Sequence, residues 1–358
     1  TRHSPLGEPV ADPHRKRRIS LRVGGGRAHG PDRERGAVLA MVAILMVVLI
    51  GATAFAIDAG NLWSSHRRLR TSTDAASLAA AKDFAEGVDG CAGVDDTYTA
   101  ANDPGATVTD CHNHPNGDAG FVTVTAGRTV GLDFAGIFGF NTADITSTTH
   151  AMYGIPTGAN GLRPMGLCAD ANPELTAWLN LPAGPTGDSG TIRIAYTKDH
   201  PDACGENAPG NWGMLDFNGG ENSNAETKEW VSNGYPQVVP LSPPSIPGDT
   251  GSFSPSIDSE LAGLVGKQFA VPIFDNVAGT GSNTTFEVVA FVWVKLVDYR
   301  VSGSQSDRYL DLQFQANQVI QGTCCGNGGS NPDTGARAVR ICATDPGHDE
   351  ACVSEDGT

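Results

Sequence analysis

The fold of this chain is decided by residues 36–86, which read GAVLAMVAILMVVLIGATAFAIDAGNLWSSHRRLRTSTDAASLAAAKDFAE. Between Ala37 and Ile57 there is no charged side chain, and nearly every residue is apolar or small. As a helix, these roughly 21 residues would be about 31 Å long, enough to cross a hydrocarbon core of about 30 Å. Backbone groups in lipid must be hydrogen-bonded within the segment. The run therefore predicts a transmembrane helix.

The sequence becomes amphipathic after Asp58 and contains no helix breaker before Gly87. Small and apolar residues recur there at helical spacing. They are Leu62, Leu69, Thr73, Ala76, Ala80 and Phe84. Such spacing places side chains on one face of a helix. We therefore predict one continuous helix over residues 36–86, which leaves the membrane and continues outside it with a narrow, alanine-rich packing stripe.

Small side chains on this helix would allow a second helix to approach closely. Within the predicted span they are Gly51, Ala52, Ala54 and Ala56. Beyond the span they are Ala75, Ala76, Ala79 and Ala80. We predict that the first set packs against another helix inside the membrane, and that the second set continues the close-packing face outside it.

Charge is distributed unevenly along the chain. Residues 1–35 contain nine Lys or Arg against four Asp or Glu, whereas the whole chain has a formal net charge of −16. Positive charge beside a span favours the cytoplasmic side, so we predict a cytoplasmic N-terminus, a single crossing of the lipid bilayer and an extracytoplasmic C-terminal region. The low hydrophobicity of residues 1–35 predicts a disordered basic tail. The acidic remainder argues against nucleic acid as a partner, because phosphate groups require basic patches.

The cysteines all follow the apolar run, at Cys91, Cys111, Cys168, Cys204, Cys324, Cys325, Cys342 and Cys352. An even number outside the predicted cytoplasmic and membrane parts is typical of disulfides in an oxidising compartment. Cys91 and Cys111 bracket a short Gly/Asp-rich loop, so we predict that they pair, and we also expect a Cys168–Cys204 bridge. The last four cysteines would pair among themselves, although a Cys168–Cys342 bridge is an alternative.

Strand patterns dominate the remainder of the chain. FVTVTAG and DITSTTHAMYG alternate with period two and predict a small β unit over residues 87–155, packed on the outer end of the helix. Residues 156–358 contain further strand candidates and form a predicted β-rich extracytoplasmic domain. The predicted fold class is α+β: a long N-terminal transmembrane and amphipathic helix followed by a disulfide-stabilised, β-rich extracytoplasmic region.

Two helices are also indicated within this predicted domain. Ser223 and Glu226 form a capping box and Gly234 provides a stop, which predicts a helix over residues 223–233. A shorter helix is predicted over residues 256–265. In the longest strand candidate, TFEVVAFVWVKLVDYR, apolar residues fall on both faces, which predicts that both faces are partly covered.

The sequence contains no recognised catalytic motif. It lacks a phosphate-binding loop and the patterns G-x-S-x-G, H-E-x-x-H, G-x-G-x-x-G and C-x-x-C. The stretch DCHNHPNGD contains zinc-ligand residue types around Cys111, His112 and His114, but we interpret it as a disulfide-tethered polar loop. The alternation of Asp170, Asn172 and Glu174 lacks the glycine and the distant glutamate of a calcium loop. We therefore predict no catalytic site, metal or cofactor.

Two further clusters are interpreted as structural. Adjacent Cys324 and Cys325 could form a redox-active pair, but a Gly-rich exported segment favours two bridges to Cys342 and Cys352. Five aromatic residues could form a ligand platform, but in a β domain such residues more often belong to the core. They are Trp212, Phe217, Trp230, Tyr235 and Trp293.

The helix region, over about residues 35–86, resembles a known family. An Arg35-Gly36 pair, the apolar run, AIDAGNLW (56–63) and RRLRTSTDAASLAAA (67–81) are similar to the N-terminal region of TadE/TadG-like Flp pilus-assembly proteins of the tight-adherence machinery. Within these stretches, a set of residues at fixed positions after the apolar run carries the resemblance, and we call it the family-like frame. It consists of Asp58, Arg68, Asp74 and the Ala75-Ala76 pair. FAGIFGFNTADITSTTHA (134–151) and GNWGMLDFNGG (210–220) resemble outer parts of actinobacterial members.

This resemblance implies a non-enzymatic, single-pass membrane protein that acts structurally in Flp pilus assembly. Its implied partners are other Tad pilus-assembly membrane proteins or pilins. It also implies a candidate processing site between Gly36 and Ala37, where pilin-type cleavage precedes the apolar run. Met41 stands where pilins carry a glutamate that neutralises the N-terminus of a neighbouring subunit.

A cleaved signal peptide is the alternative interpretation of the apolar run. Ala54-Phe55-Ala56 satisfies the A-x-A cleavage pattern, and a basic region precedes the run. The chain would then be a secreted or anchored cell-envelope enzyme or an adhesin. The length of the run and the helical pattern beyond it favour the retained anchor.

Overall fold

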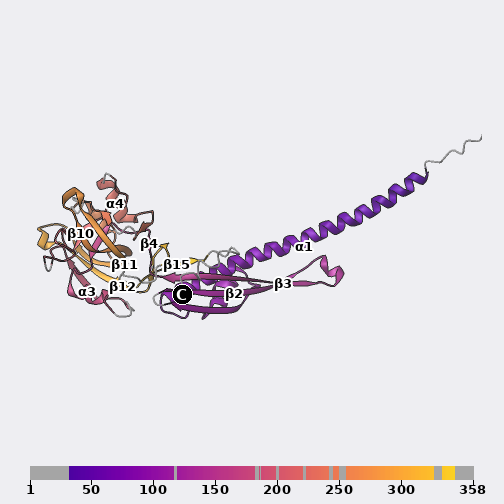
Figure 1. Ribbon diagram of the computed structural model, residues 1–358, viewed down its shortest axis with the longest axis horizontal. Coiled ribbons are helices and arrows are strands. Elements are labelled where there is room, and N and C mark those ends of the chain that lie inside the picture. Colours follow the sequence, from indigo (N-terminus) through magenta and orange to yellow (C-terminus); the bar gives the residue numbers. More distant parts are fainter. Residues whose placement is uncertain are drawn as a thin grey trace, which may run out of the picture. The chain divides into compact units, whose positions relative to one another are not determined.

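The computed structural model describes residues 32–116, 119–181, 185, 187–198, 201–220, 223–241, 245–249, 255–325 and 333–342 (Figure 1). The chain divides into two compact units, Thr1–Ala56 and Ile57–Thr358. One helix, α1 (Asp32–Ala85), begins in the first unit and ends in the second. The predicted continuous helix is therefore confirmed.

The part of α1 in the first unit exposes apolar side chains on all sides, from Val38 to Phe55. The helix is long and apolar enough to cross a membrane. The hydroxyl of Thr53 donates to the backbone carbonyls of Leu49 and Ile50, at 3.0 and 2.9 Å. This polar group is thus satisfied within the helix, as a lipid environment requires.

The second unit begins with the outer part of α1, which packs on a five-stranded sheet in the order β1-β2-β3-β15-β13. All neighbouring strands are antiparallel except β13 and β15, which are parallel. The strands are β1 (Thr107–Asn116), β2 (Ala119–Gly131), β3 (Thr142–Gly154), β13 (Gln318–Val319) and β15 (Ala336–Ile341). Figure 1 shows β2 and β3 as a long paired ribbon.

Alanine residues bring the helix close to this sheet. Ala76 and Ala80 are fully buried, in one cluster with Val122 and Val124 of β2. The chain then turns back over the helix at Gly90, where an added Cβ would collide with the carbonyl oxygen of Ala80. The predicted alanine stripe therefore faces the chain's own sheet.

The last described strand completes the first sheet. β15 pairs with β3 in antiparallel register, with Ala338 opposite Gly154 and Ile341 opposite Ala151. The sequence predicts a strand at ARAVRICA but does not show its partner. The sheet beside α1 thus combines residues that follow the helix directly with residues near the end of the described chain.

A seven-stranded sheet forms the larger core, in the order β6-β12-β11-β10-β5-β7, with β9 also paired to β11. Only the β5–β10 pair is parallel among the described pairs of this sheet. The strands are β5 (Met165–Cys168), β6 (Thr191–Ala195), β7 (Trp212–Met214), β9 (Ser245–Pro247), β10 (Gln268–Ala278), β11 (Thr285–Arg300) and β12 (Tyr309–Gln315). A small third sheet contains β4 (Gly158–Ala159), β8 (Val239–Pro240) and β14 (Gly322–Thr323).

The central strand β11 follows the predicted alternation. One face carries buried apolar side chains at every second position from Phe286 to Leu296. On the other face, Phe291 is buried and Trp293 is half-buried. Both faces are therefore partly covered, as the pattern of apolar residues predicts.

Short helices surround the strands. They are α2 (Ala100–Asn102), α3 (Pro173–Leu179), α4 (Asn224–Asn233) and α5 (Asp258–Ala262), with a π-helix η1 (Asp95–Thr99) and 3-10 turns η2 (Ala135–Phe138), η3 (Pro255–Ile257), η4 (Gly281–Asn283) and η5 (Gln305–Asp307). The Ser223 hydroxyl accepts from the backbone N–H of Glu226, and Gly234 ends α4. The predicted helix at 223–233 is confirmed, and the one at 256–265 is shorter than predicted.

Two of the expected disulfides are present. Cys91 pairs with Cys111, and Cys168 pairs with Cys204. The second pairing excludes the alternative Cys168–Cys342 bridge. Both bridges join segments that lie close along the chain, and they attach to the middle of β1 at Cys111 and to the end of β5 at Cys168.

The C-terminal cysteines differ from expectation. The structure pairs Cys324 with Cys325, whereas we expected bridges from these two residues to Cys342 and Cys352. Both sulfur atoms lie beside β15, at 3.3 and 3.7 Å from the backbone carbonyl oxygen of Ala338. Cys342 is also disulfide-bonded and packs in the same apolar cluster. Cys352 lies outside the described residues.

Replacing Ala80 with leucine tests the packing of α1 on the sheet. Three extra heavy atoms at this fully buried position would overpack the contact and destabilise the fold by about 1–3 kcal/mol. Thermal unfolding of the purified chain in detergent would measure the effect. Ala79→Leu, at the neighbouring half-buried position, is the matched control and is expected to cost less. Equal unfolding temperatures for the two variants would contradict the packing described here.

Candidate functional site

The carboxylate of Asp58 connects the helix to the β2–β3 hairpin. Asp58 is the first charged residue after the apolar segment. Its side chain is buried beside the turn between the end of β2 and the start of β3. One oxygen accepts from the backbone N–H groups of Asp133 and Phe134, at 2.9 and 3.2 Å. The other accepts from Phe134 and Ala135, at 3.1 and 2.7 Å. Three consecutive backbone donors therefore bind one side chain of α1.

These hydrogen bonds determine the charge state of Asp58. Burial by itself raises the pKa of the carboxyl group. The hydrogen bonds from Ala135, Phe134 and Asp133 lower it, and together they outweigh the effect of burial, so the pKa lies below its usual range. A depressed folded-state pKa means that the stabilising contribution is fully present at neutral pH and is lost as the pH falls through that pKa. The link is therefore intact under physiological conditions.

Additional polar contacts follow the helix outward from Asp58. The amide of Asn61 donates to the backbone carbonyl of Gly131, at 3.1 Å. Further along, the hydroxyl of Thr149 on β3 donates to the carboxylate of Asp74, at 2.8 Å. Asp58 and Asp74, two residues of the family-like frame, thus both bind the β2–β3 hairpin. Arg68, from the same frame, is exposed on the helix.

The hairpin ends in an apolar tip, which we define as residues 132–141. Its aromatic and aliphatic side chains are exposed: Ile137 by 79%, Phe138 by 81% and Phe140 by 67%. The tip is closed by a hydrogen bond from the N–H of Leu132 to the carbonyl of Asn141, at 2.9 Å. Gly139 has a positive φ of 92° and caps η2. Period-two alternation predicted strands on either side of this tip but not the tip itself, although the three phenylalanines of FAGIFGF were visible in the sequence.

The predicted helix-packing residues are divided between two surroundings. Gly51, Ala52 and Ala56 are exposed on α1, and Ala54 is partly covered. Ala75 and Ala79 are half-buried, whereas Ala76 and Ala80 are fully buried against the chain's own sheet. Gly36 and Ala37, the candidate processing site, lie within the bounds of α1.

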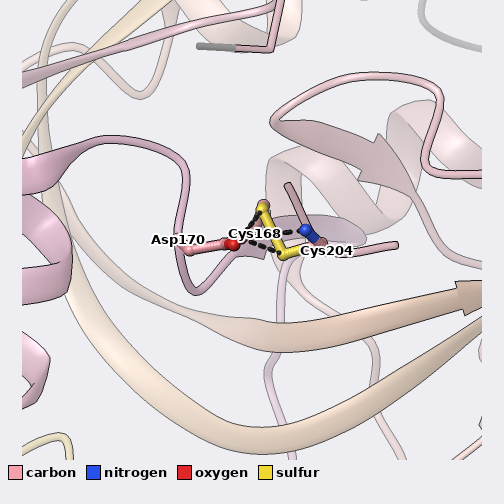
Figure 2. Close-up of side chains that lie close together, drawn as sticks. All are labelled: Cys168, Asp170 and Cys204. Carbon is pink, nitrogen blue, oxygen red and sulfur yellow. Dashed lines mark hydrogen bonds between the residues drawn. A yellow bond between two sulfur atoms is a disulfide. The ribbon is translucent and has the colours of Figure 1, made fainter. Parts of the chain in front are cut away.

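The described residues contain one group of side chains with metal-ligand atoms close together: Cys168, Asp170 and Cys204. Figure 2 shows the Asp170 carboxylate directed at the two sulfur atoms, which are bonded to each other. Asp170 Oδ1 accepts from the backbone N–H of Cys204 at 2.9 Å, which holds Cys204 at its positive φ of 49°. A disulfide offers no thiolate, and thiolates are the cysteine form that binds metals. In this oxidised state the group serves as a structural link.

The other candidate ligands are occupied structurally as well. Cys111 forms a disulfide, His112 contacts Asp110 at 3.1 Å, and the ring of His114 stacks on Phe121 at 4.4 Å. Asp118 lies outside the described residues. In the predicted calcium-like stretch, the Asn172 side chain caps α3 by accepting from Leu175 N–H, at 2.8 Å.

The proposed aromatic platform belongs to the core. Trp212 and Trp230 are buried, and Trp230 packs edge-on against Tyr235 with ring centroids 4.9 Å apart. Phe217 covers the same two rings, at 5.9 and 5.3 Å. These residues therefore contribute to packing, as interpreted from the sequence.

A cavity of about 310 Å³ lies between strands of the larger core. Its lining includes Tyr196, Asn207, Asp249, Thr284 and Phe286. Asp249 is the only carboxylate among the described lining residues, and it accepts from the hydroxyl of Thr227 at 3.1 Å. A glycoside-cleaving site needs two carboxylates facing each other, and this cavity does not provide them.

The helix carries the similarity to known proteins. Residues 36–83 match the family model "Putative Flp pilus-assembly TadE/G-like". The match covers the apolar segment and the outer part of α1 up to the alanines that face the sheet. The search of curated proteins and the search of solved structures each found no match. A Tad-like segment on a helix able to cross a membrane fits a Flp pilus-assembly membrane protein.

Replacing Asp58 with alanine tests the link between α1 and the hairpin. Without the carboxylate, the N–H groups of Asp133, Phe134 and Ala135 lose their acceptor, so their deuterium exchange at neutral pH is expected to become several-fold faster. Hydrogen–deuterium exchange of the full chain in detergent would measure it. Asp133→Ala is the matched control, because its side chain is exposed and its backbone N–H still donates to Asp58. Equal exchange in the two variants would show that Asp58 does not hold the tip.

Proposed function

We propose that this chain is a single-pass membrane protein that takes part structurally, without catalysis, in Flp pilus assembly at the cell envelope. The observation that carries the proposal is the coincidence of the TadE/G-like match with α1. The match begins with the apolar segment and ends where the helix is packed on the five-stranded sheet. The likeness of the outer stretches to actinobacterial members supports the same role.

The proposed topology places the N-terminus in the cytoplasm and the β-rich region outside. The basic residues before Gly36 support this orientation, since positive charge is retained on the cytoplasmic side. The disulfides Cys91–Cys111 and Cys168–Cys204 support an oxidising compartment for the region after the helix. Together these features favour a bitopic anchor over a cytoplasmic protein.

The proposed mechanism is assembly through helix contacts. Ala76 and Ala80 are occupied by the chain's own sheet, which leaves the small residues of the apolar segment as the available close-packing face. Ala52 and Ala56 are four residues apart in this segment, so they share one side of the helix, and Gly60 continues that side just beyond the segment. Small residues at this spacing let a partner helix approach closely in lipid. The partners would be other Tad membrane proteins or pilins, and the acidic β-rich region would face them outside.

Fractionation of the native cells, with N-terminal sequencing of the protein, tests the anchor. We expect the chain in the membrane fraction, resistant to alkaline extraction, with residues 38–56 retained, because this segment is apolar on every side. A start at Ala37 would keep the anchor and identify Gly36 as a processing site. A chain recovered from the medium and starting at Ile57 would overturn the anchor and favour the secreted enzyme or adhesin.

Enlarging the small face tests the helix contact. Ala52→Leu together with Ala56→Leu is expected to reduce co-purification with other pilus-assembly membrane proteins several-fold, because bulk on this face keeps a partner helix away. Ala40→Leu together with Ala43→Leu adds the same bulk at exposed positions on the opposite side of the same helix and is the control. Unchanged co-purification of the variant with Ala52→Leu and Ala56→Leu, with normal membrane levels, would contradict assembly through this face.

A further inference from the structure

The apolar tip of the β2–β3 hairpin exposes several large side chains close together. Ile137, Phe138 and Phe140 are each at least two-thirds exposed, and they come from seven consecutive residues, FAGIFGF. Exposing this much apolar surface to water on one turn is energetically unfavourable, and an exposed apolar patch of this kind marks an interaction site. No Lys or Arg lies within the tip, so an acidic partner has no charge to recognise there.

Three contacts show which end of the helix the tip approaches. Leu69 packs with Ala126 of β2, Asn61 binds the carbonyl of Gly131, and Asp58 binds the N–H groups that follow. From residue 126 to residue 133, the chain therefore contacts positions of α1 that are progressively closer to the N-terminus of the helix. Within the second unit, the hairpin therefore runs toward the first turn of that unit's part of α1, which starts at Ile57, and turns back at the tip.

Asp58 places the tip at the boundary of the apolar segment. It follows Ile57 directly, and the apolar run ends there. Its carboxylate binds the backbone of residues 133–135, so the tip is attached to the first residue that would emerge from the hydrocarbon core. The interfacial layer on each side of that core is roughly 5–8 Å thick.

The helix itself carries a second interfacial marker at this height. Trp63 is 67% exposed, and it lies five residues after Asp58, which is about 8 Å along the helix axis. Tryptophan is enriched where a membrane protein passes the headgroup layer. The exposed basic residues Arg67 and Arg68 follow one turn later, where they can reach phosphate groups.

We propose that the tip of the β2–β3 hairpin, residues 134–140, inserts into the outer interfacial layer of the bilayer that the apolar segment crosses. The protein would then hold the membrane at two points, the helix and the hairpin, with Asp58 between them. This inference rests on the proposed membrane anchor. The two contacts would fix the tilt and rotation of the β-rich region above the membrane, which one helix alone does not do.

Site-directed labelling of the full chain in vesicles tests the insertion. The described cysteines contain no free thiol, so a new cysteine at an exposed position can be labelled with an environment-sensitive fluorophore. The label is placed at Phe138→Cys in the tip, at Val47→Cys in the apolar segment and at Leu181→Cys, an exposed position after α3. The vesicles contain phosphatidylethanolamine and phosphatidylglycerol, with a fraction of lipid carrying a spin label on the acyl chain as quencher, and iodide serves as the aqueous quencher.

We expect the label at position 138 to lose more than half of its fluorescence to the acyl-chain quencher and to be protected from iodide. The label at position 181 should behave in the opposite way. In a second variant, Ile137→Asp and Phe138→Asp with the label at Phe140→Cys, the lipid quenching should fall to the level seen at position 181. The substituted side chains are exposed, so these changes leave the packed core intact.

The label at position 47 distinguishes a failure of tip insertion from a failure of the membrane anchor. Lipid quenching at position 47 but not at position 138 would overturn tip insertion and leave the anchor in place. Protection of position 138 from iodide without lipid quenching would also overturn it, and would indicate a contact between protein molecules. Absence of lipid quenching at both positions would overturn the anchor and the tip insertion together.

Discussion

The hydrogen bonds between the Asp58 carboxylate and three consecutive backbone N–H groups are the constraint on which the membrane-proximal structure depends. They join a helix residue to a turn about 75 positions later in the chain. A carboxylate satisfies several donors at once, and a neutral side chain of similar size would leave some of them without an acceptor. The outer part of α1, the hairpin and the tip are therefore organised around one charged side chain, which directly follows the apolar segment in the sequence.

The alanines of α1 extend this organisation outward. A stripe of small side chains lets the sheet lie close to the helix, and the buried valines of β2 fill the contact. The same residues would also allow another helix to approach, so sequence alone suggested an intermolecular role for them. Because a buried surface serves only one partner, the alanines that face the chain's own sheet are not available to a second helix, and we therefore assign the proposed assembly contact to the small residues of the apolar segment.

The β-rich region has the character of a rigid scaffold. Its large core is built on a long central strand, and disulfides link Cys91 to Cys111 and Cys168 to Cys204. The candidate ligand groups are used for structure: Asp170 supports a disulfide, Asn172 caps a helix and the tryptophans pack in the core.

Local patterns in the sequence determined the elements themselves. The uncharged run and helical spacing predicted α1, alternating residues predicted β2, β3 and β11, and loop closure predicted the Cys91–Cys111 bridge. These features depend on neighbours along the chain, whose spacing sets the exposed and buried faces. The tertiary structure alone decided that Asp58 binds the hairpin, that β15 returns to β3, that Cys324 pairs with Cys325 and that Ala76 faces its own sheet. Periodicity predicts that a face of an element is buried, but it does not predict which segment covers that face. The covering segment comes from a distant part of the chain, and only the packing of the folded structure determines which segment that is.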